Sequence, residues 1–126
     1  MSQEDILAGV RHLARLGEVD LNRAGIAGGS YGGFMTLTAL TKSPEFWRAG
    51  AESYGMADLA LDYELGGKQF ADWYHTEMGS PKTHPELFHD RSSIHFLDRI
   101  RAPLLIFQGA NDTNVPVVEA EQVVES

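Results

Sequence analysis

Apolar residues recur at helical spacing near both ends of the chain. Residues 2–16 place them three or four positions apart, which predicts an amphipathic helix with one core-facing side. Ser2 and Asp5 form a capping-box pattern at its start, and Gly17 is a typical helix stop. The same spacing over 117–124 predicts a final helix.

Three short segments, at 24–27, 49–54 and 104–107, predict strands between these helices. The segment 104–107 is the clearest of them, because it is uninterrupted and lies between Pro103 and Gly109. Such a run is typical of a strand that is buried on both faces of a parallel sheet. Strands that alternate with helices indicate an α/β architecture.

The rest of the chain is expected to hold turns and shorter helices. The predicted elements are a turn at 20–22, a glycine-dense turn at 28–33, a helix over 34–40 that Pro44 ends, irregular helices and loops over 58–91, and a short helix over 93–99. Three strands are too few for a complete doubly wound sheet. We therefore expect the chain to contain only part of one.

The glycine-dense turn carries the first candidate for chemistry. Gly28 and Gly32 flank Ser30 in a G-x-S-x-G pattern between a predicted strand and a predicted helix. In such a turn the serine hydroxyl projects from a sharp, strained bend, and side chains at both glycine positions are expected to collide with the neighbouring strand and helix. The backbone N–H of Tyr31 at the helix start would then serve as an oxyanion donor. The alternative is a glycine-rich turn with an incidental serine, but the flanking elements and Gly33 favour a nucleophile.

The second candidate is Asp112, in the loop that follows the strand 104–107. Functional groups of doubly wound sheets cluster in loops at the carboxyl ends of strands. A carboxylate there can orient a catalytic histidine and stabilise its charged form. The alternative is an aspartate that caps the next helix, which is common in turns. The presence of Ser30 upstream, in the expected order, favours the catalytic interpretation.

These motifs together resemble the prolyl oligopeptidase family of serine peptidases, and most closely its acylaminoacyl-peptidase and dipeptidyl-aminopeptidase-like branch. The matching segments are 28–36, 49–51 with 54–55, 98–105, and 108–112 with 115–116. The resemblance implies a partial α/β-hydrolase fold, a parallel sheet with flanking helices, usually joined to a β-propeller that limits substrate size. It implies hydrolysis of short peptides through an acyl-enzyme, without a cofactor. Ser30 matches the family nucleophile, Asp112 the acid, and the Tyr31 amide one oxyanion donor, and a second donor would precede residue 1.

The catalytic histidine of this fold follows the acid in chain order. All five histidines precede Asp112; they are His12, His75, His84, His89 and His95. We therefore expect residues 1–126 to be an internal fragment that lacks upstream strands and a downstream histidine segment. On this interpretation the isolated chain is inactive, because a serine without a base is a weak nucleophile. Its partners would be a peptide substrate and the rest of the parent chain, the β-propeller included.

Several functional alternatives stay open. A carboxylesterase or lipase uses the same triad, and a non-catalytic module could retain the fold. The aromatic residues at 63, 70, 73 and 74 are expected to pack in a core rather than to line a substrate pocket. Glu52 is either a group that meets a substrate's amino terminus or a surface charge.

Composition excludes several classes of function and of binding site. The absence of cysteine excludes disulfides and thiolate chemistry. His84 and His89 could share a metal ion, but no third ligand with suitable spacing accompanies them, so no metal site is expected. The net charge of −8 argues against nucleic-acid binding. No apolar run of about 18 residues predicts a membrane span. No signal peptide is evident, so a cytoplasmic location is expected; a homo-oligomeric state is left open.

Overall fold

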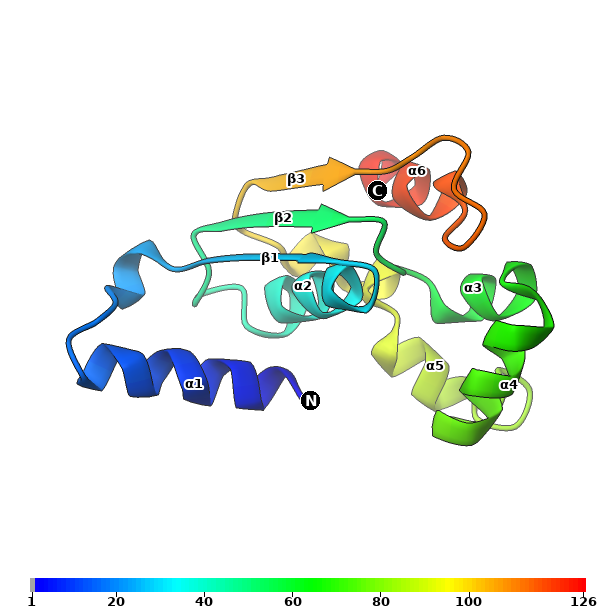
Figure 1. Cartoon of the computed structure of the whole chain (residues 1–126), viewed down its shortest axis with the longest axis horizontal. Helices are drawn as coiled ribbons and strands as arrows, with labels where there is room; N and C mark the ends of the chain where they lie inside the picture. The colour runs from blue at the N-terminus through cyan, green and yellow to red at the C-terminus, as the bar shows by residue number, and fades with distance from the viewer. Residues whose placement is uncertain (1) are drawn as a thin grey trace.

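The computed structural model describes residues 2–126 and contains a parallel sheet of three strands. The strands β1 (Gly25–Gly29), β2 (Ala49–Ser53) and β3 (Leu104–Phe107) lie in that order across the sheet (Figure 1). The helices are α1 (Gln3–Arg15), α2 (Tyr31–Lys42), α3 (Leu59–Leu65), α4 (Gly67–Glu77), α5 (Pro85–Arg91) and α6 (Val117–Glu125), with 3-10 turns η1 (Leu21–Arg23) and η2 (Ser93–Arg99). The predicted parallel sheet with flanking helices is therefore confirmed.

The start of α1 is set by local hydrogen bonds. The Ser2 N–H donates to Asp5 Oδ2 at 2.8 Å, and the Asp5 N–H donates to Ser2 Oγ at 3.3 Å. These two bonds satisfy backbone N–H groups that have no partner within the helix. Gly17 follows the helix with φ +79°, a left-handed conformation that glycine adopts without strain. Both predicted ends of this helix are confirmed.

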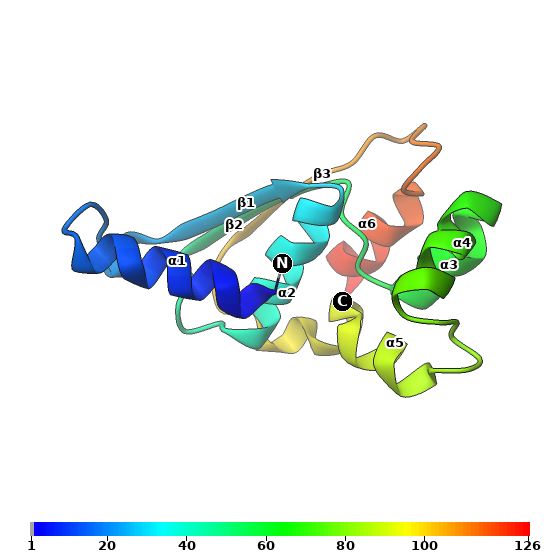
Figure 2. The ribbon, with the colours of Figure 1, turned by 60° about the horizontal axis from the view of Figure 1, so that its bottom comes forward.

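One face of the sheet is covered by α1 and α2 (Figures 1 and 2). Leu7 of α1 and Leu40 of α2 are buried there with Trp47. Gly50 of β2 lies directly under α2, since a Cβ at this position would come within 2.5 Å of Leu40 Cδ1. This tight contact sets the separation between helix and sheet.

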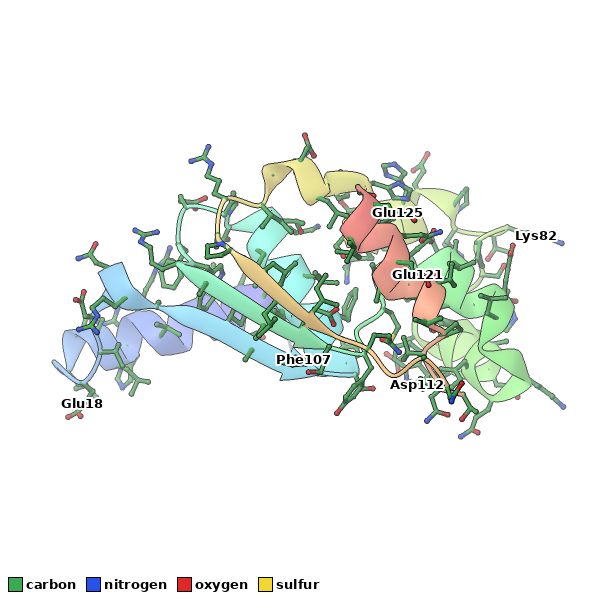
Figure 3. The ribbon with its side chains drawn as sticks, turned by 90° about the horizontal axis from the view of Figure 1, so that it is seen from above. Glu18, Lys82, Phe107, Asp112, Glu121 and Glu125 are labelled. Atoms are coloured by element: carbon green, nitrogen blue, oxygen red, sulfur yellow. The ribbon has the colours of Figure 1, made fainter. Side chains whose placement is uncertain are left out.

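The opposite face of the sheet is open within the described residues. Leu105 and Phe107 of β3 are each 55% exposed, and Figure 3 shows the labelled Phe107 beside the uncovered strands. An open apolar depression of about 540 Å³ lies along β1, β2 and β3 on this face. The prediction that 104–107 is buried on both faces is therefore wrong for this chain, because only one of the two covering layers of a parallel sheet is present among residues 2–126.

Two other predicted regions differ from the structure. The turn expected over 28–33 is reduced to one residue, because β1 runs to Gly29 and α2 already begins at Tyr31. The region 58–91 contains three regular helices, α3, α4 and α5, which lie beyond the carboxyl ends of the strands (Figures 1 and 2). No helix within residues 2–126 combines the length and hydropathy that crossing a bilayer requires.

Candidate active site

Ser30 alone forms the turn between β1 and α2. Its backbone has φ 55° and ψ −121°, a conformation that residues with a side chain rarely adopt. The Ser30 N–H donates to the Ser53 carbonyl at 3.0 Å and extends the sheet, while the Ser30 carbonyl accepts from the Phe34 N–H at 3.0 Å and starts the helix. The bend leaves the Ser30 side chain exposed at the carboxyl edge of the sheet.

The glycines around Ser30 act through contacts between backbones. A Cβ at Gly28 would lie 2.3 Å from the Gly32 carbonyl oxygen, whereas a Cβ at Gly32 would meet nothing within 4 Å. The expected collision is thus confirmed for Gly28 and wrong for Gly32, whose backbone is the surface that Gly28 packs against. Gly33 is also required, because its Cβ would lie 2.7 Å from Gly55 Cα in the segment that follows β2.

These contacts predict different outcomes for two similar substitutions. Gly28→Ala is expected to destabilise the domain by about 1–3 kcal/mol, since the added methyl group overpacks a backbone contact. Gly32→Ala should change stability by less than about 1 kcal/mol, because alanine fits the first turn of a helix. Urea unfolding of both variants in the polypeptide that carries this segment compares them. Equal losses at the two positions would contradict the contact described here.

Tyr31 is the first residue of α2, so its backbone N–H has no partner within the helix. Its ring is partly exposed and packs edge-on against Trp73, with ring centroids 6.3 Å apart. Among residues 2–126 this N–H has no acceptor, so a donor at a helix N-terminus lies beside Ser30, the arrangement that the oxyanion prediction requires.

A cavity of about 570 Å³ opens beside Ser30. Its walls come from α2, from the segment after β2, and from one face of α4; the lining residues are Ser30, Tyr31, Met56, Gln69, Phe70, Trp73 and Glu77. Positions 70, 73 and 77 follow helical spacing, so a single face of α4 supplies most of the wall. Three of these seven residues are aromatic, and Glu77 is the one carboxylate.

The aromatic residues of this region divide between two roles. Phe70 and Trp73 line the cavity, and Trp73 is 42% exposed, so the packing prediction is wrong for these two. Tyr74 is fully buried, and Tyr63 packs against it with ring centroids 6.0 Å apart, so the packing prediction is confirmed for them. Met56, Gln69 and Glu77 also line the cavity, although no sequence motif marks them.

Asp112 lies in the loop after β3, where Figure 3 labels it just past Phe107. Its Oδ1 accepts hydrogen bonds from the backbone N–H groups of Asn114 at 2.8 Å and Val115 at 3.0 Å, and neither bond uses Oδ2. These two donors lower the pKa of Asp112. Asp112 therefore stabilises the loop at the carboxyl end of β3. It does not cap α6, which begins at Val117 after Pro116, so the helix-cap alternative is wrong in this respect.

The structure brings Ser30 and Asp112 to the same edge of the sheet. Ser30 follows β1 and Asp112 follows β3, with β2 between them. Because the strands are parallel, both residues follow carboxyl ends, and the axes of β1 and β3 are separated by two strand spacings, about 10 Å.

None of the five histidines lines the cavity beside Ser30. All of them are exposed, and four have partners of their own. His75 Nε2 lies 3.0 Å from the Tyr63 hydroxyl, His84 Nδ1 lies 2.9 Å from Thr83 Oγ1, and His89 and His95 stack with ring centroids 4.1 Å apart. Over residues 2–126, no three metal-binding side chains come together. The described residues therefore place no histidine in the cavity beside Ser30.

Glu52 has a role that neither earlier interpretation included. It is 1% exposed, and its Oε2 accepts a hydrogen bond from the Gly55 N–H at 2.8 Å. Burial raises its pKa. Glu52 is thus neither a surface charge nor a group open to a substrate; it holds the chain that leaves β2.

Comparison with known proteins identifies the family of this site. The family model described as "Prolyl oligopeptidase family" matches residues 1–126. The chain belongs to the prolyl oligopeptidase family. It is 32% identical over 98% of its length to dipeptidyl aminopeptidase BIII of Pseudoxanthomonas mexicana, and 27% identical over 90% to the human acylamino-acid-releasing enzyme.

Solved structures agree with this assignment. A puromycin-hydrolysing peptidase of Mycobacterium tuberculosis superposes with a TM-score of 0.88 at 31% identity over 98% of this chain. The acylaminoacyl peptidase of Pyrococcus horikoshii gives 0.86 at 27% identity, also over 98%. The partial α/β-hydrolase fold is therefore confirmed. The chain spans 19% of the dipeptidyl aminopeptidase and 20% of the Pyrococcus structure, about a fifth of each.

Proposed function

We propose that this chain is the nucleophile-bearing part of a serine peptidase that hydrolyses short peptides, as an aminopeptidase, dipeptidyl-peptidase or acylaminoacyl-peptidase. The observation that carries the proposal is Ser30, held at φ 55° between β1 and α2 with its side chain exposed beside an aromatic cavity. The names of the relatives support peptide hydrolysis. The rest of the polypeptide, with a β-propeller and the missing strands, would complete the enzyme.

The proposed reaction is acyl transfer in two steps. The Ser30 hydroxyl attacks the scissile carbonyl carbon while a histidine outside this chain accepts its proton. The tetrahedral oxyanion is stabilised by the Tyr31 N–H, and Asp112 holds the histidine in the correct tautomer. The histidine then protonates the leaving amine as the C–N bond breaks, which leaves an acyl-enzyme on Ser30. Water hydrolyses this ester by the reverse proton path, and no cofactor takes part.

The cavity beside Ser30 suggests which substrate side chains fit. Phe70, Trp73 and Met56 offer apolar surface, and the volume of about 570 Å³ accommodates a large side chain. We expect the residue on the acyl side of the scissile bond to occupy it, with large apolar side chains preferred over small ones.

A serine-directed reagent tests the proposal. We expect a fluorophosphonate to label the longer polypeptide stoichiometrically at Ser30, and to label the isolated 126-residue chain at least about a thousandfold more slowly, because the base is missing. Mass spectrometry of peptides locates the label, and circular dichroism checks that the isolated chain is folded. Labelling of the longer polypeptide at another serine would refute the assignment. Rapid labelling of the isolated chain would show that a base lies within it.

A further inference from the structure

The segment that leaves β2 is held by two buried carboxylates. Glu52 Oε2 accepts from the Gly55 N–H at 2.8 Å, and Glu119 Oε2 accepts from the N–H groups of Ala57 and Asp58, each at 2.9 Å. Glu119 comes from α6, more than sixty residues away in the chain, and is fully buried. Three backbone donors in four successive residues are thus bound by acidic side chains.

This segment shapes the cavity beside Ser30. Met56 lies between the two points of attachment and forms part of the cavity wall. Its neighbour Gly55 packs against Gly33 in the first turn of α2. A shift of the segment would therefore move the cavity wall while Ser30 itself stays on β1 and α2.

Glu119 also links this wall to the Asp112 loop. Asp112 Oδ1 binds the Val115 N–H, and Gln108 Nε2 donates to the Val115 carbonyl at 2.9 Å. Val115 is buried two residues before α6 begins, and Glu119 lies in the first turn of that helix. A short, hydrogen-bonded path therefore connects the loop of Asp112 to the segment of Met56.

A carboxylate is a costly group for this position. Glu119 Oε1 is buried without a hydrogen-bond partner among the described residues, and so is Asp62 Oδ1. Burial first, and then the neighbouring carboxyl groups of Asp62 and Asp58, raise the pKa of Glu119 to about 7. Burial of a charge without full compensation is unfavourable. Charge-assisted bonds to backbone donors are, however, stronger and shorter than neutral ones, which suits a group that must hold a segment in place.

We propose that Glu119 is a positioning residue that fixes the Met56 wall of the Ser30 cavity relative to the Asp112 loop. This inference rests on the proposed peptidase function. Glu119 touches no substrate; it sets the size of the cavity and hence which side chains the enzyme accepts.

Three variants of the longer polypeptide test the inference. Glu119→Ala removes the acceptor, Glu119→Gln keeps an acceptor oxygen without the charge, and Glu121→Ala is a matched control at an exposed position of the same helix. Two peptide anilides that differ only in the side chain on the acyl side, phenylalanine or alanine, report on the cavity. The labelling rate with a small fluorophosphonate reports on Ser30 alone, and hydrogen exchange reports on the amides of Ala57 and Asp58.

We expect Glu119→Ala to raise KM for the phenylalanine substrate about tenfold and to speed exchange of both amides at least about tenfold, since two hydrogen bonds to a charged group are lost. KM for the alanine substrate and the fluorophosphonate rate should change less than about threefold. Glu119→Gln should restore all of these values to within about threefold of wild type, and Glu121→Ala should leave them unchanged.

The inference is overturned if KM for the two substrates rises equally, or if the fluorophosphonate rate falls as KM for the phenylalanine substrate rises, because either result indicates general loss of structure. It is also overturned if Glu119→Gln, the variant that retains an acceptor, fails to restore the phenylalanine KM. Failure of the proposed function looks different: the wild-type polypeptide would then react with neither anilide nor fluorophosphonate. Unchanged amide exchange in Glu119→Ala would remove the structural basis of the inference whether or not the enzyme is active.

Discussion

Replacing Ser30 by alanine in the longer polypeptide is expected to lower kcat/KM for peptide hydrolysis by about 10⁵-fold, because the acyl-enzyme can no longer form. Stability should be almost unchanged. The Ser30 hydroxyl is exposed and makes no hydrogen bond within residues 2–126, so alanine removes no structural contact. Alanine also keeps the Cβ, and with it the unfavourable φ of 55°. Anilide hydrolysis and urea unfolding, measured on the same preparation, check both statements.

Ser30→Gly provides an internal comparison. Glycine adopts positive φ without strain, so this variant should be as inactive as Ser30→Ala but more stable by about 1 kcal/mol. The difference in stability between the two variants would measure the backbone strain that a side chain at position 30 carries. The nucleophile assignment would be wrong if either variant kept more than about a tenth of the wild-type kcat/KM.

Elements that are specified by nearby residues could be predicted from the sequence. The strand 104–107 matches β3 at both ends because its apolar run is bounded by Pro103 and by a polar loop. The start of α1 follows from the Ser2 and Asp5 pair alone. The position of Ser30 in the bend between β1 and α2 could be predicted because a strand, a glycine pattern and a helix follow one another within a few residues. Its position at the carboxyl edge of the sheet, shared with Asp112, follows from parallel strand order.

Features that depend on distant contacts could not be predicted. Glu119 and Glu121 look alike in the sequence, and only the packing of α6 against the segment after β2 buries the first and exposes the second. Trp73 and Tyr74 are adjacent, yet about 100° of helix rotation sends one to the cavity and the other to the core. The face of α4 that meets Ser30 is decided by how α3 and α4 pack, which local spacing does not reveal.

The second substitution that we expect to reduce catalysis strongly is at Asp112. Asp112→Asn should lower kcat by about 10⁴-fold, because an amide cannot stabilise the imidazolium and favours the wrong histidine tautomer. The loop should remain intact, since an asparagine Oδ1 can still accept from the N–H groups of Asn114 and Val115. Asp112→Ala removes both roles, and it should therefore also destabilise the loop.

The pH dependence of kcat/KM distinguishes the titration of the histidine from that of Asp112. Hydrogen bonds from Val115 and Asn114 lower the pKa of Asp112, so the carboxylate stays ionised throughout the range in which a histidine titrates. The fall of kcat/KM toward acid pH, near about pH 6.5, should then report the histidine and not Asp112. The stabilising effect of the Asp112 turn is present above the ordinary aspartate pKa and is lost only as pH falls through the lowered value.

Asp20 offers a matched control for the loss of charge. Its Oδ1 accepts from the Asn22 N–H at 2.9 Å in a similar turn, but this turn precedes β1 and lies at the amino end of the sheet. Asp20→Asn therefore removes one carboxylate from the same kind of turn, far from Ser30, and should leave kcat within about twofold of wild type. If Asp112→Asn behaved in the same way, Asp112 would be a turn residue only, and the acid of this peptidase would have to lie elsewhere. A large loss at Asp112 alone would instead show that its charge acts on the reaction, because both residues accept the backbone N–H two positions further on and asparagine can keep that bond.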